Sequence, residues 1–420
     1  MTIDALIDEK ISQAVAAALQ NVARGPSAYG VAVANGYTGT AAEWLASLKG
    51  EPGQAGAGAT YAPKAQTGGG WPAFKTALDA QVLRARDLPP ASGAKINLAD
   101  AYPGTNTNSF AAGVVLPDGR IYLAPHTAAN ARIYDPATKT LVTPTGSFGV
   151  AGGWNGAVLL DDGRVFIVPH NSSTARIFDP ATETLTTPGG TYPGNYAYVG
   201  AVKMADGRVL LVPHNAVAAR IYDPATDSVS VVGTFSGYYA YAGGVLLPDG
   251  RVFLVPHMAT VGKIYDPATN TFSDTAATFP GAEGFVGGVL LADGRVFLSP
   301  HKSSTARIWN PADDTVTTPA GNYGAAGTAN FCGATLLPDG RVFIAPFQST
   351  AGKIYDPVKN VLLTPTGTHQ GAGAYHDAVL THDGRVFLVP YNSTIATVAV
   401  TGYGFNLDPQ IVLSAFWNGF

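Results

Sequence analysis

The phrase Asp-Gly-Arg occurs seven times in the chain at an almost constant spacing. Its aspartates are Asp118, Asp162, Asp206, Asp249, Asp293, Asp339 and Asp383, so that successive copies lie 44, 44, 43, 44, 46 and 44 residues apart. Each of the first six copies has an apolar run, the Asp-Gly turn, a second apolar run ending in Pro, a polar loop, a third apolar segment, a turn of the Asp-Pro-Ala-Thr type and a last short strand. Two hairpins in each period indicate four strands per repeat.

This pattern predicts an all-β fold, a seven-bladed β-propeller of four-stranded blades, over residues 93–404. Asp-Gly is expected to form a two-residue type I′ hairpin turn, and Pro after Asp suits an outer edge strand. The last repeat lacks its fourth strand after residues 394–400. We expect residues 95–98 to supply that strand and to close the ring. The alternative is that they are only a linker.

The first 92 residues have a different pattern. Residues 1–26 predict a helix with a narrow apolar stripe, which favours oligomerisation or attachment to a larger assembly. Residues 27–70 include a short run with Gly at every third position, which resembles collagen. Residues 71–92 predict a helical linker, and residues 405–420 form an apolar C-terminal tail that must cover something.

Composition excludes several classes of function. The net charge is −4, which makes nucleic acid an unexpected partner. The first ten residues carry acids where a signal peptide has bases, and no run of about 18 apolar residues predicts membrane insertion. The single cysteine, Cys332, rules out an intramolecular disulfide framework. No cofactor is expected.

Residues 27–50, Ser-Ala-Tyr-Gly-Val-Ala-Val-Ala-Asn-Gly-Tyr-Thr-Gly-Thr-Ala-Ala-Glu-Trp-Leu-Ala-Ser-Leu-Lys-Gly, run straight into Glu-Pro-Gly. This segment resembles one that is common in bacteriophage tail fibre and other tail-appendage proteins. Residues 411–420 resemble short C-terminal signatures of phage tail proteins more loosely. The resemblance implies a virion protein, made in the host cytoplasm, that attaches to other tail or baseplate proteins through residues 1–60. It also implies a homotrimer and a host cell-surface receptor, either glycan or protein.

The repeats at residues 111–400 resemble kelch or galactose-oxidase-like repeats in their Asp-Gly-Arg and Tyr-Asp-Pro-Ala-Thr phrases. One difference matters, because Pro-His stands where a kelch repeat has Gly-Gly after its second strand. The ligand sites of kelch adaptors therefore cannot be transferred to this chain.

Binding is expected on the propeller face that carries the loops between second and third strands and the connections between blades, because these are longer and more varied. The connections are rich in aromatic residues that suit saccharide or protein surfaces. The candidate receptor contacts are Trp154, Tyr196, Tyr238, Tyr239, Phe285, Tyr323 and Tyr375. The alternative is that such rings pack between blades, which is at least as expected for Phe285.

A histidine follows Pro at one repeat position in five copies, at His126, His170, His214, His257 and His301, and Phe347 and Tyr391 continue the series. Propeller symmetry places these side chains on a ring. A shared metal is disfavoured because ligands must converge within about 2.0–2.2 Å of one point. We expect each side chain to pack beside the neighbouring strand and to bond a backbone carbonyl or an Arg-bearing loop, with ligand contact as the alternative.

Catalysis is disfavoured because glycosidic hydrolysis usually needs two carboxylates. The loops between second and third strands contain no Asp or Glu, and the blade connections add only Asp274, Glu283 and Asp377. The favoured function is therefore non-catalytic receptor binding. One alternative is a surface-polysaccharide depolymerase that uses Glu283, Asp377 and His376, and another is a non-binding structural component of the virion.

Overall fold

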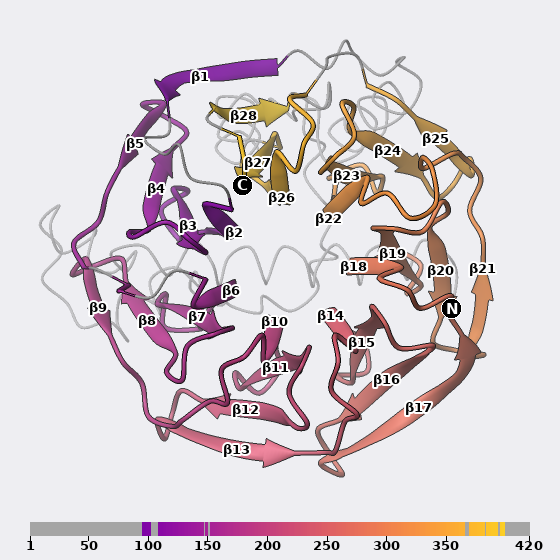
Figure 1. Cartoon of the computed structure of the whole chain (residues 1–420), viewed down its shortest axis with the longest axis horizontal. Helices are drawn as coiled ribbons and strands as arrows, with labels where there is room; N and C mark the ends of the chain where they lie inside the picture. The colour runs from indigo at the N-terminus through magenta and orange to yellow at the C-terminus, as the bar shows by residue number, and fades with distance from the viewer. Residues whose placement is uncertain are drawn as a thin grey trace, which may run out of the picture. The chain divides into compact units, whose positions relative to one another are not determined.

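The computed structural model describes residues 95–101, 108–146, 148–149, 152–365, 369–382, 384–393 and 395–399. These residues form seven four-stranded antiparallel sheets around a central axis (Figure 1). The predicted all-β propeller of four-stranded blades is confirmed. Within these ranges, no helix is long and apolar enough to cross a bilayer.

Each blade runs from an innermost strand near the axis to an outermost strand at the rim (Figure 1). The innermost strands are β2 (Phe110–Val115), β6 (Trp154–Leu159), β10 (Tyr198–Lys203), β14 (Tyr241–Leu246), β18 (Phe285–Leu290), β22 (Phe331–Leu336) and β26 (Tyr375–Leu380). The second strands are β3 (Ile121–Pro125), β7 (Val165–Pro169), β11 (Val209–Pro213), β15 (Val252–Pro256), β19 (Val296–Pro300), β23 (Val342–Pro346) and β27 (Val386–Pro390). The third strands are β4 (Arg132–Asp135), β8 (Arg176–Asp179), β12 (Ala219–Asp223), β16 (Val261–Asp266), β20 (Arg307–Asn310), β24 (Lys353–Asp356) and β28 (Ile395–Ala399). The outermost strands are β5 (Thr140–Val142), β9 (Thr184–Thr186), β13 (Ser228–Val232), β17 (Thr271–Thr278), β21 (Thr315–Thr317), β25 (Val361–Leu363) and, in the last blade, β1 (Lys95–Ala101).

The ring closes through the first strand of the chain. β1 pairs antiparallel with β28, with Lys95 opposite Ala399 and Asn97 opposite Thr397. The blade β1-β28-β27-β26 therefore combines chain segments from both ends of the propeller. The prediction that residues 95–98 complete the last blade is confirmed, and this pairing covers an edge that would otherwise invite association with another chain.

The Asp-Gly-Arg turn differs from the prediction. Gly119 has a φ of 88° whereas Asp118 is not left-handed, so the turn is not type I′. The amide of Gly119 donates to the carbonyl of Leu116, and the amide of Leu116 donates to the carbonyl of Arg120. This is the three-residue loop that joins a type I turn to a left-handed glycine. The carboxylate of Asp118 accepts from the amide and Nε of Arg120 at 3.0 and 2.7 Å, which explains why the three residues recur together.

Aromatic side chains stack across the interfaces between blades. Phe166 on β7 stacks on Tyr222 on β12 of the next blade, with ring centroids 4.8 Å apart. Phe387 on β27 makes the same contact with Tyr134 on β4, at 5.0 Å, and joins the last blade to the first. The five residues of each described second strand are all buried, because blades pack on both faces of these strands. The core is thus a closed series of interfaces between blades.

Glycines lie where the innermost strands approach one another. A Cβ on Gly156 would lie 2.9 Å from the Cα of Gly200, and one on Gly243 would lie 3.0 Å from the Cα of Gly287. All four of these glycines have positive φ. The first and last blades depart from this pattern, because Ala112 on β2 and Asp377 on β26 stand at the equivalent positions. A Cβ on Gly333 would lie 2.7 Å from Oδ1 of Asp377, so the acidic side chain lies against the innermost strand of the neighbouring blade.

The predictions for residues 1–26, 27–70, 71–92 and 405–420 lie outside the described residues. The described strands fall within the predicted propeller range of 93–404.

Candidate ligand-binding site

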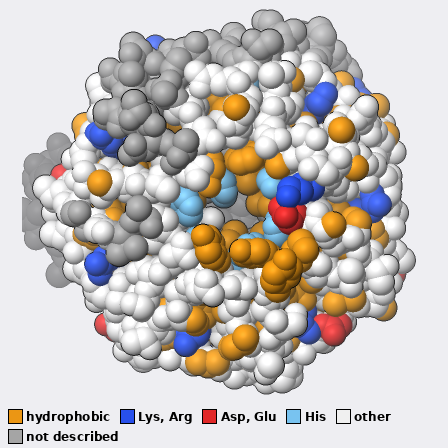
Figure 2. All heavy atoms as spheres, viewed as in Figure 1, with side chains coloured by type: hydrophobic (Ala, Val, Ile, Leu, Met, Phe, Trp, Pro, Cys, Tyr) orange, Lys and Arg blue, Asp and Glu red, His pale blue; other side chains and the backbone are white. Residues whose placement is uncertain are grey.

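Seven aromatic side chains form a closed ring around the central hollow on one face of the propeller. Neighbouring ring centroids are 5.3 to 6.3 Å apart. The members of this mouth ring are His126, His170, His214, His257, His301, Phe347 and Tyr391. Figure 2 shows histidine side chains, in pale blue, gathered around the hollow. The ring predicted from the repeat position is therefore present.

Each histidine of the mouth ring is bound to the neighbouring blade. Nδ1 of His170 lies 2.9 Å from the carbonyl oxygen of Tyr198, the first residue of the next innermost strand. The other four make the same bond at 2.7 to 2.9 Å. Of the two expected partners, a backbone carbonyl or an Arg-bearing loop, the structure shows the carbonyl. Because a carbonyl only accepts, Nδ1 carries the hydrogen and Nε2 keeps its lone pair.

The ring geometry does not gather these histidines around one metal ion. The centre of a heptagon lies further from each corner than adjacent corners lie from each other, whereas zinc needs nitrogen ligands at about 2.0–2.2 Å. Among the described residues, no group of three or more His, Cys, Asp or Glu side chains is arranged to hold a metal ion.

The mouth ring is kept neutral by burial. Burial lowers the pKa of His170 and His301 to about 4 and that of His214 to about 3, although the bond to the carbonyl raises each of them in part. The pKa values of His126 and His257 are lowered for the same reason. At neutral pH the ring therefore presents uncharged imidazoles.

A tyrosine patch adjoins one side of the mouth ring. It consists of Tyr196, which is 45% exposed, Tyr238, which is 68% exposed, and the half-buried Tyr239. Tyr196 meets His170 edge to face at 5.0 Å, and Tyr239 lies 4.8 Å from His214. Figure 2 shows hydrophobic side chains, in orange, covering one part of the rim. The prediction that these three rings lie at the binding face agrees with this placement.

The backbone of the tyrosine patch is strained. Tyr196, Tyr238 and Tyr239 have φ of 58°, 61° and 53°, a left-handed conformation that is an outlier for bulky residues. Asparagines of the previous blade stabilise it. Oδ1 of Asn171 accepts from the amide of Tyr196 at 2.7 Å, and Oδ1 of Asn215 accepts from the amide of Tyr238 at 3.0 Å. Strain of this kind persists where the surrounding structure enforces it, and it is concentrated at functional sites.

An ion pair lies beside the patch. Nζ of Lys302 is 2.7 Å from Oε2 of Glu283, and both side chains are about one-third exposed. Burial raises the pKa of Glu283, but the hydrogen bond to Lys302 and the charge of Lys302 outweigh it, so that the net shift of this pKa is downward. Figure 2 shows an acidic and a basic group side by side at the rim of the hollow. Glu283 is therefore ionised and paired.

His376 and Asp377 on β26 add a polar segment next to the mouth ring. The ring of His376 lies 4.8 Å from that of Tyr391, and its Nδ1 donates to the carbonyl of Ala111. Burial lowers the pKa of His376 to about 3 and raises that of Asp377 to about 7, although amide donors partly offset the second shift. A neutral imidazole and a readily protonated carboxyl therefore belong to successive residues of β26. Asp274, the third acid assigned to the blade connections, instead lies on β17 and pairs with Lys263.

Four of the predicted receptor contacts are core residues. Exposure is 1% for Trp154, 0% for Phe285, 0% for Tyr323 and 1% for Tyr375. The expectation that Trp154 is exposed is wrong, because its ring packs edge to face against Phe148 between blades. Phe285 agrees with the alternative of packing between blades. At the first position of an innermost strand, the carbonyl faces the mouth ring while the side chain enters the core.

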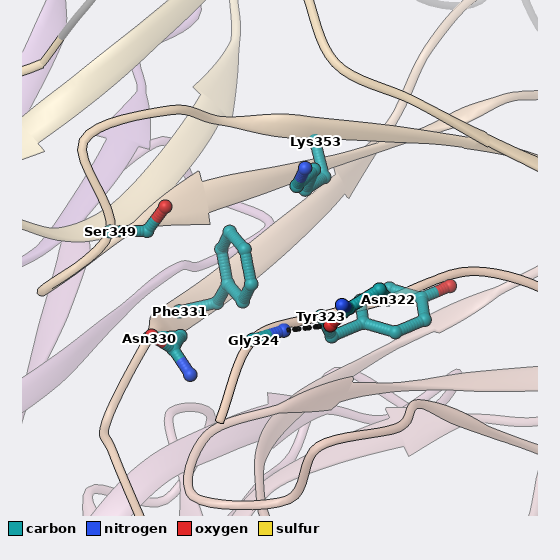
Figure 3. Close-up of a pocket in the computed structure, with 7 residues that line it drawn as sticks. All are labelled: Asn322, Tyr323, Gly324, Asn330, Phe331, Ser349 and Lys353. Carbon is teal, nitrogen blue, oxygen red and sulfur yellow. Dashed lines mark hydrogen bonds between the residues drawn. The ribbon is translucent and has the colours of Figure 1, made fainter. Parts of the chain in front are cut away.

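A separate cavity of about 270 Å³ lies between the connection that precedes β22 and the blade that β22 begins. Figure 3 shows Phe331 between Ser349 and Lys353 on one side and the Asn322-Tyr323-Gly324 segment on the other, with Asn330 next to Phe331. The amide of Gly324 donates to the side chain of Asn322 at 2.8 Å. Tyr323 therefore lines this cavity rather than the hollow.

Sequence reasoning missed the groups that support the patch. Asn171 and Asn215 follow directly after a mouth-ring histidine, and Lys302 follows His301 in the same way. The repeat position could have identified all three, because it places them on the same face as the histidines. What it could not show is that the asparagines accept from the backbone of the neighbouring blade.

No family model and no curated protein matches the sequence. Solved structures match in fold. A streptogramin B lyase aligns with a TM-score of 0.61 at 10% identity, covering 73% of this chain and 97% of that chain. A catalytically inactive virginiamycin B lyase from Staphylococcus aureus with quinupristin aligns with a TM-score of 0.59 at 10% identity, covering 73% of this chain and 98% of that chain. The extracellular domain of a hybrid two component system from B. thetaiotaomicron aligns with a TM-score of 0.56 at 10% identity, covering 73% of this chain and 39% of that chain. At this identity the likeness concerns the fold alone.

Proposed function

We propose that the protein is a phage tail fibre or tail-tip receptor-binding protein, whose propeller adheres to a bacterial surface receptor at the mouth ring. The observation that carries the proposal is the tyrosine patch, where Tyr196 and Tyr238 are exposed on a strained backbone beside the mouth ring. Exposed aromatic rings on a rigid scaffold are typical of recognition surfaces. Support for the virion context comes from the sequence resemblance at residues 27–50. None of the three similar structures described above is a phage protein.

The test is adhesion of the full-length protein to intact cells of a panel of bacterial strains, measured by fluorescence of the labelled protein. We expect binding to particular strains and a loss of at least tenfold in Tyr196→Ala and Tyr238→Ala. Val231→Ala is the control, because Val231 is 62% exposed but lies on β13 at the rim of its blade. Adhesion that is equally strong in all four proteins would contradict the proposal. Binding to no strain would favour a structural role in the virion.

A second candidate function is cleavage of a surface polysaccharide. It is favoured by Asp377, whose raised pKa allows it to hold a proton near neutral pH, and by the adjacent residue His376. The name lyase carried by two similar propellers also makes catalysis worth testing. Polysaccharide from bound cells should become shorter during incubation with the protein, and Asp377→Asn should abolish this. Unchanged polymer length would leave recognition as the function.

A further inference from the structure

We propose that the hollow at the mouth ring takes the neutral, hydroxyl-rich end of a saccharide chain, which stacks on Tyr196 and Tyr238 and donates hydrogen bonds to the histidines. This inference rests on the proposed function, because it names the chemistry of the receptor. Three features of the mouth carry it: a surplus of acceptors, an aromatic platform and an asymmetric rim.

The surplus of acceptors comes from the mouth ring. In all five histidines Nδ1 is used by a backbone carbonyl, and no described residue donates to Nε2. Each Nε2 is an acceptor because the imidazoles are neutral. A ligand in the hollow must therefore bring donors, and hydroxyl groups do so. Anionic groups bring acceptors, and the nearby cation of Lys302 is already paired with Glu283.

The aromatic platform lies next to these acceptors. Tyr196 stands between His170 and Tyr239, at 5.0 and 6.3 Å, and Tyr238 lies 5.3 Å from Tyr239. A pyranose ring has one or two faces of C–H groups and a circumference of hydroxyls. It can place a face on a tyrosine ring while its hydroxyls reach neighbouring acceptors. Tyrosine suits this role because its rigid ring loses little conformational entropy on binding.

The rim of the mouth is uneven at one position, with large side chains on its high side and small residues on its low side. The residues two positions before each innermost strand follow one another around it. Three consecutive blades carry Tyr196, Tyr239 and Glu283 at this position, and the other four carry Ala329, Gly373, Asn108 and Gly152. At this position the described side chains leave more room on the low side, where the rest of the sugar chain would lie. The mouth thus fits the end of a glycan that continues over the small residues.

The experiment compares two treatments of the cells that the full-length protein binds. Periodate cleaves vicinal diols of sugars, whereas a protease digests exposed proteins. We expect periodate to reduce adhesion at least tenfold and the protease to leave it unchanged. In parallel, saturation-transfer NMR with neutral oligosaccharides released from these cells by mild acid should show transfer to C–H protons. This transfer should be lost in Tyr196→Ala and Tyr238→Ala and kept in Val231→Ala.

The outcomes separate the two proposals. Adhesion that depends on the tyrosines, resists periodate and is lost after protease would overturn the saccharide inference and leave receptor binding intact. Transfer that persists in both alanine variants would place a sugar elsewhere and also overturn the inference. Absence of adhesion to every strain would remove the proposed function, and this inference with it.

Discussion

His170 and Tyr196 meet edge to face at the mouth of the propeller, with ring centroids 5.0 Å apart and ring planes at 85°. His170 begins the loop between the second and third strands of one blade, and Tyr196 lies in the connection to the next blade. Nδ1 of His170 donates a hydrogen bond to the carbonyl of Tyr198, which holds the imidazole ring in place. The exposed tyrosine therefore rests on a side chain that cannot easily turn, which limits the entropy lost when a ligand binds.

The strain at Tyr238 leads to opposite predictions for stability and binding. Its φ of 61° suits glycine, and its side chain is 68% exposed. Tyr238→Gly should therefore keep or raise the free energy of unfolding, by up to about 1 kcal/mol, because relief of left-handed strain is worth about that much. Adhesion to cells should fall at least tenfold. Urea unfolding and cell-binding curves measure the two effects, and an unchanged adhesion would show that Tyr238 has no part in recognition.

Substitution of Trp154 should mainly affect stability. Trp154 is 1% exposed and packs among the side chains between two blades. Trp154→Ala should lower the free energy of unfolding by about 3–5 kcal/mol, as is usual for large buried aromatic residues. Tyr238→Ala is the matched control and should lie within about 0.5 kcal/mol of the parent. Equal stability of the two variants in urea would be inconsistent with the burial of Trp154.

The mouth ring makes stability depend on pH. In the unfolded chain these histidines titrate near 6.5, whereas in the folded chain the pKa is about 4 for His170 and His301 and about 3 for His214. As pH falls from about 7 to about 4, these histidines bind protons in the unfolded chain but stay neutral in the folded chain. Stability should then fall by up to about 1.4 kcal/mol per pH unit for each such histidine.

Other groups nearby modify this slope in known directions. His126, His257 and His376 have lowered pKa values and add to it. Asp377 opposes it, because its raised pKa lets the folded state bind a proton below about pH 7. The ionised pair of Glu283 and Lys302 adds destabilisation only below the usual pKa of a glutamate. Urea unfolding at several pH values measures the slope. His214→Phe should reduce this slope by the contribution of one histidine. A slope near zero between pH 7 and 5 in the parent protein would refute the prediction.

Ring closure predicts a sharp difference between two truncations. A fragment of residues 91–420 keeps β1, whereas a fragment of residues 102–420 lacks it and leaves the edge of β28 unpaired. The shorter fragment should melt at a lower temperature and form dimers or aggregates, because an open strand edge pairs with another chain. Thermal unfolding and size-exclusion chromatography compare the two. Identical behaviour would mean that β1 adds nothing to the closed ring.

Much of the fold follows from the sequence alone. The constant spacing of Asp-Gly-Arg defines the repeat. The turns and apolar runs inside each repeat predict its four strands, because both are local signals. The closing strand at residues 95–98 was also predictable, since the last repeat lacks one strand and the first is preceded by a spare one. The same symmetry places the histidines in a ring, because equivalent positions in a propeller lie at the same height around its axis.

The tertiary structure decided which aromatic residues can meet a ligand. Trp154 and Tyr196 stand in equivalent blade connections, but Trp154 begins a strand and points into the core, whereas Tyr196 lies two residues earlier, on a left-handed turn. Composition cannot separate these positions, because burial depends on where the neighbouring blade lies. The turn type at Asp118 was misjudged for a related reason: Asp-Gly fits two turns, and the bond between Leu116 and Arg120 selects one. The lowered histidine pKa values likewise arise only when the closed ring removes these side chains from water.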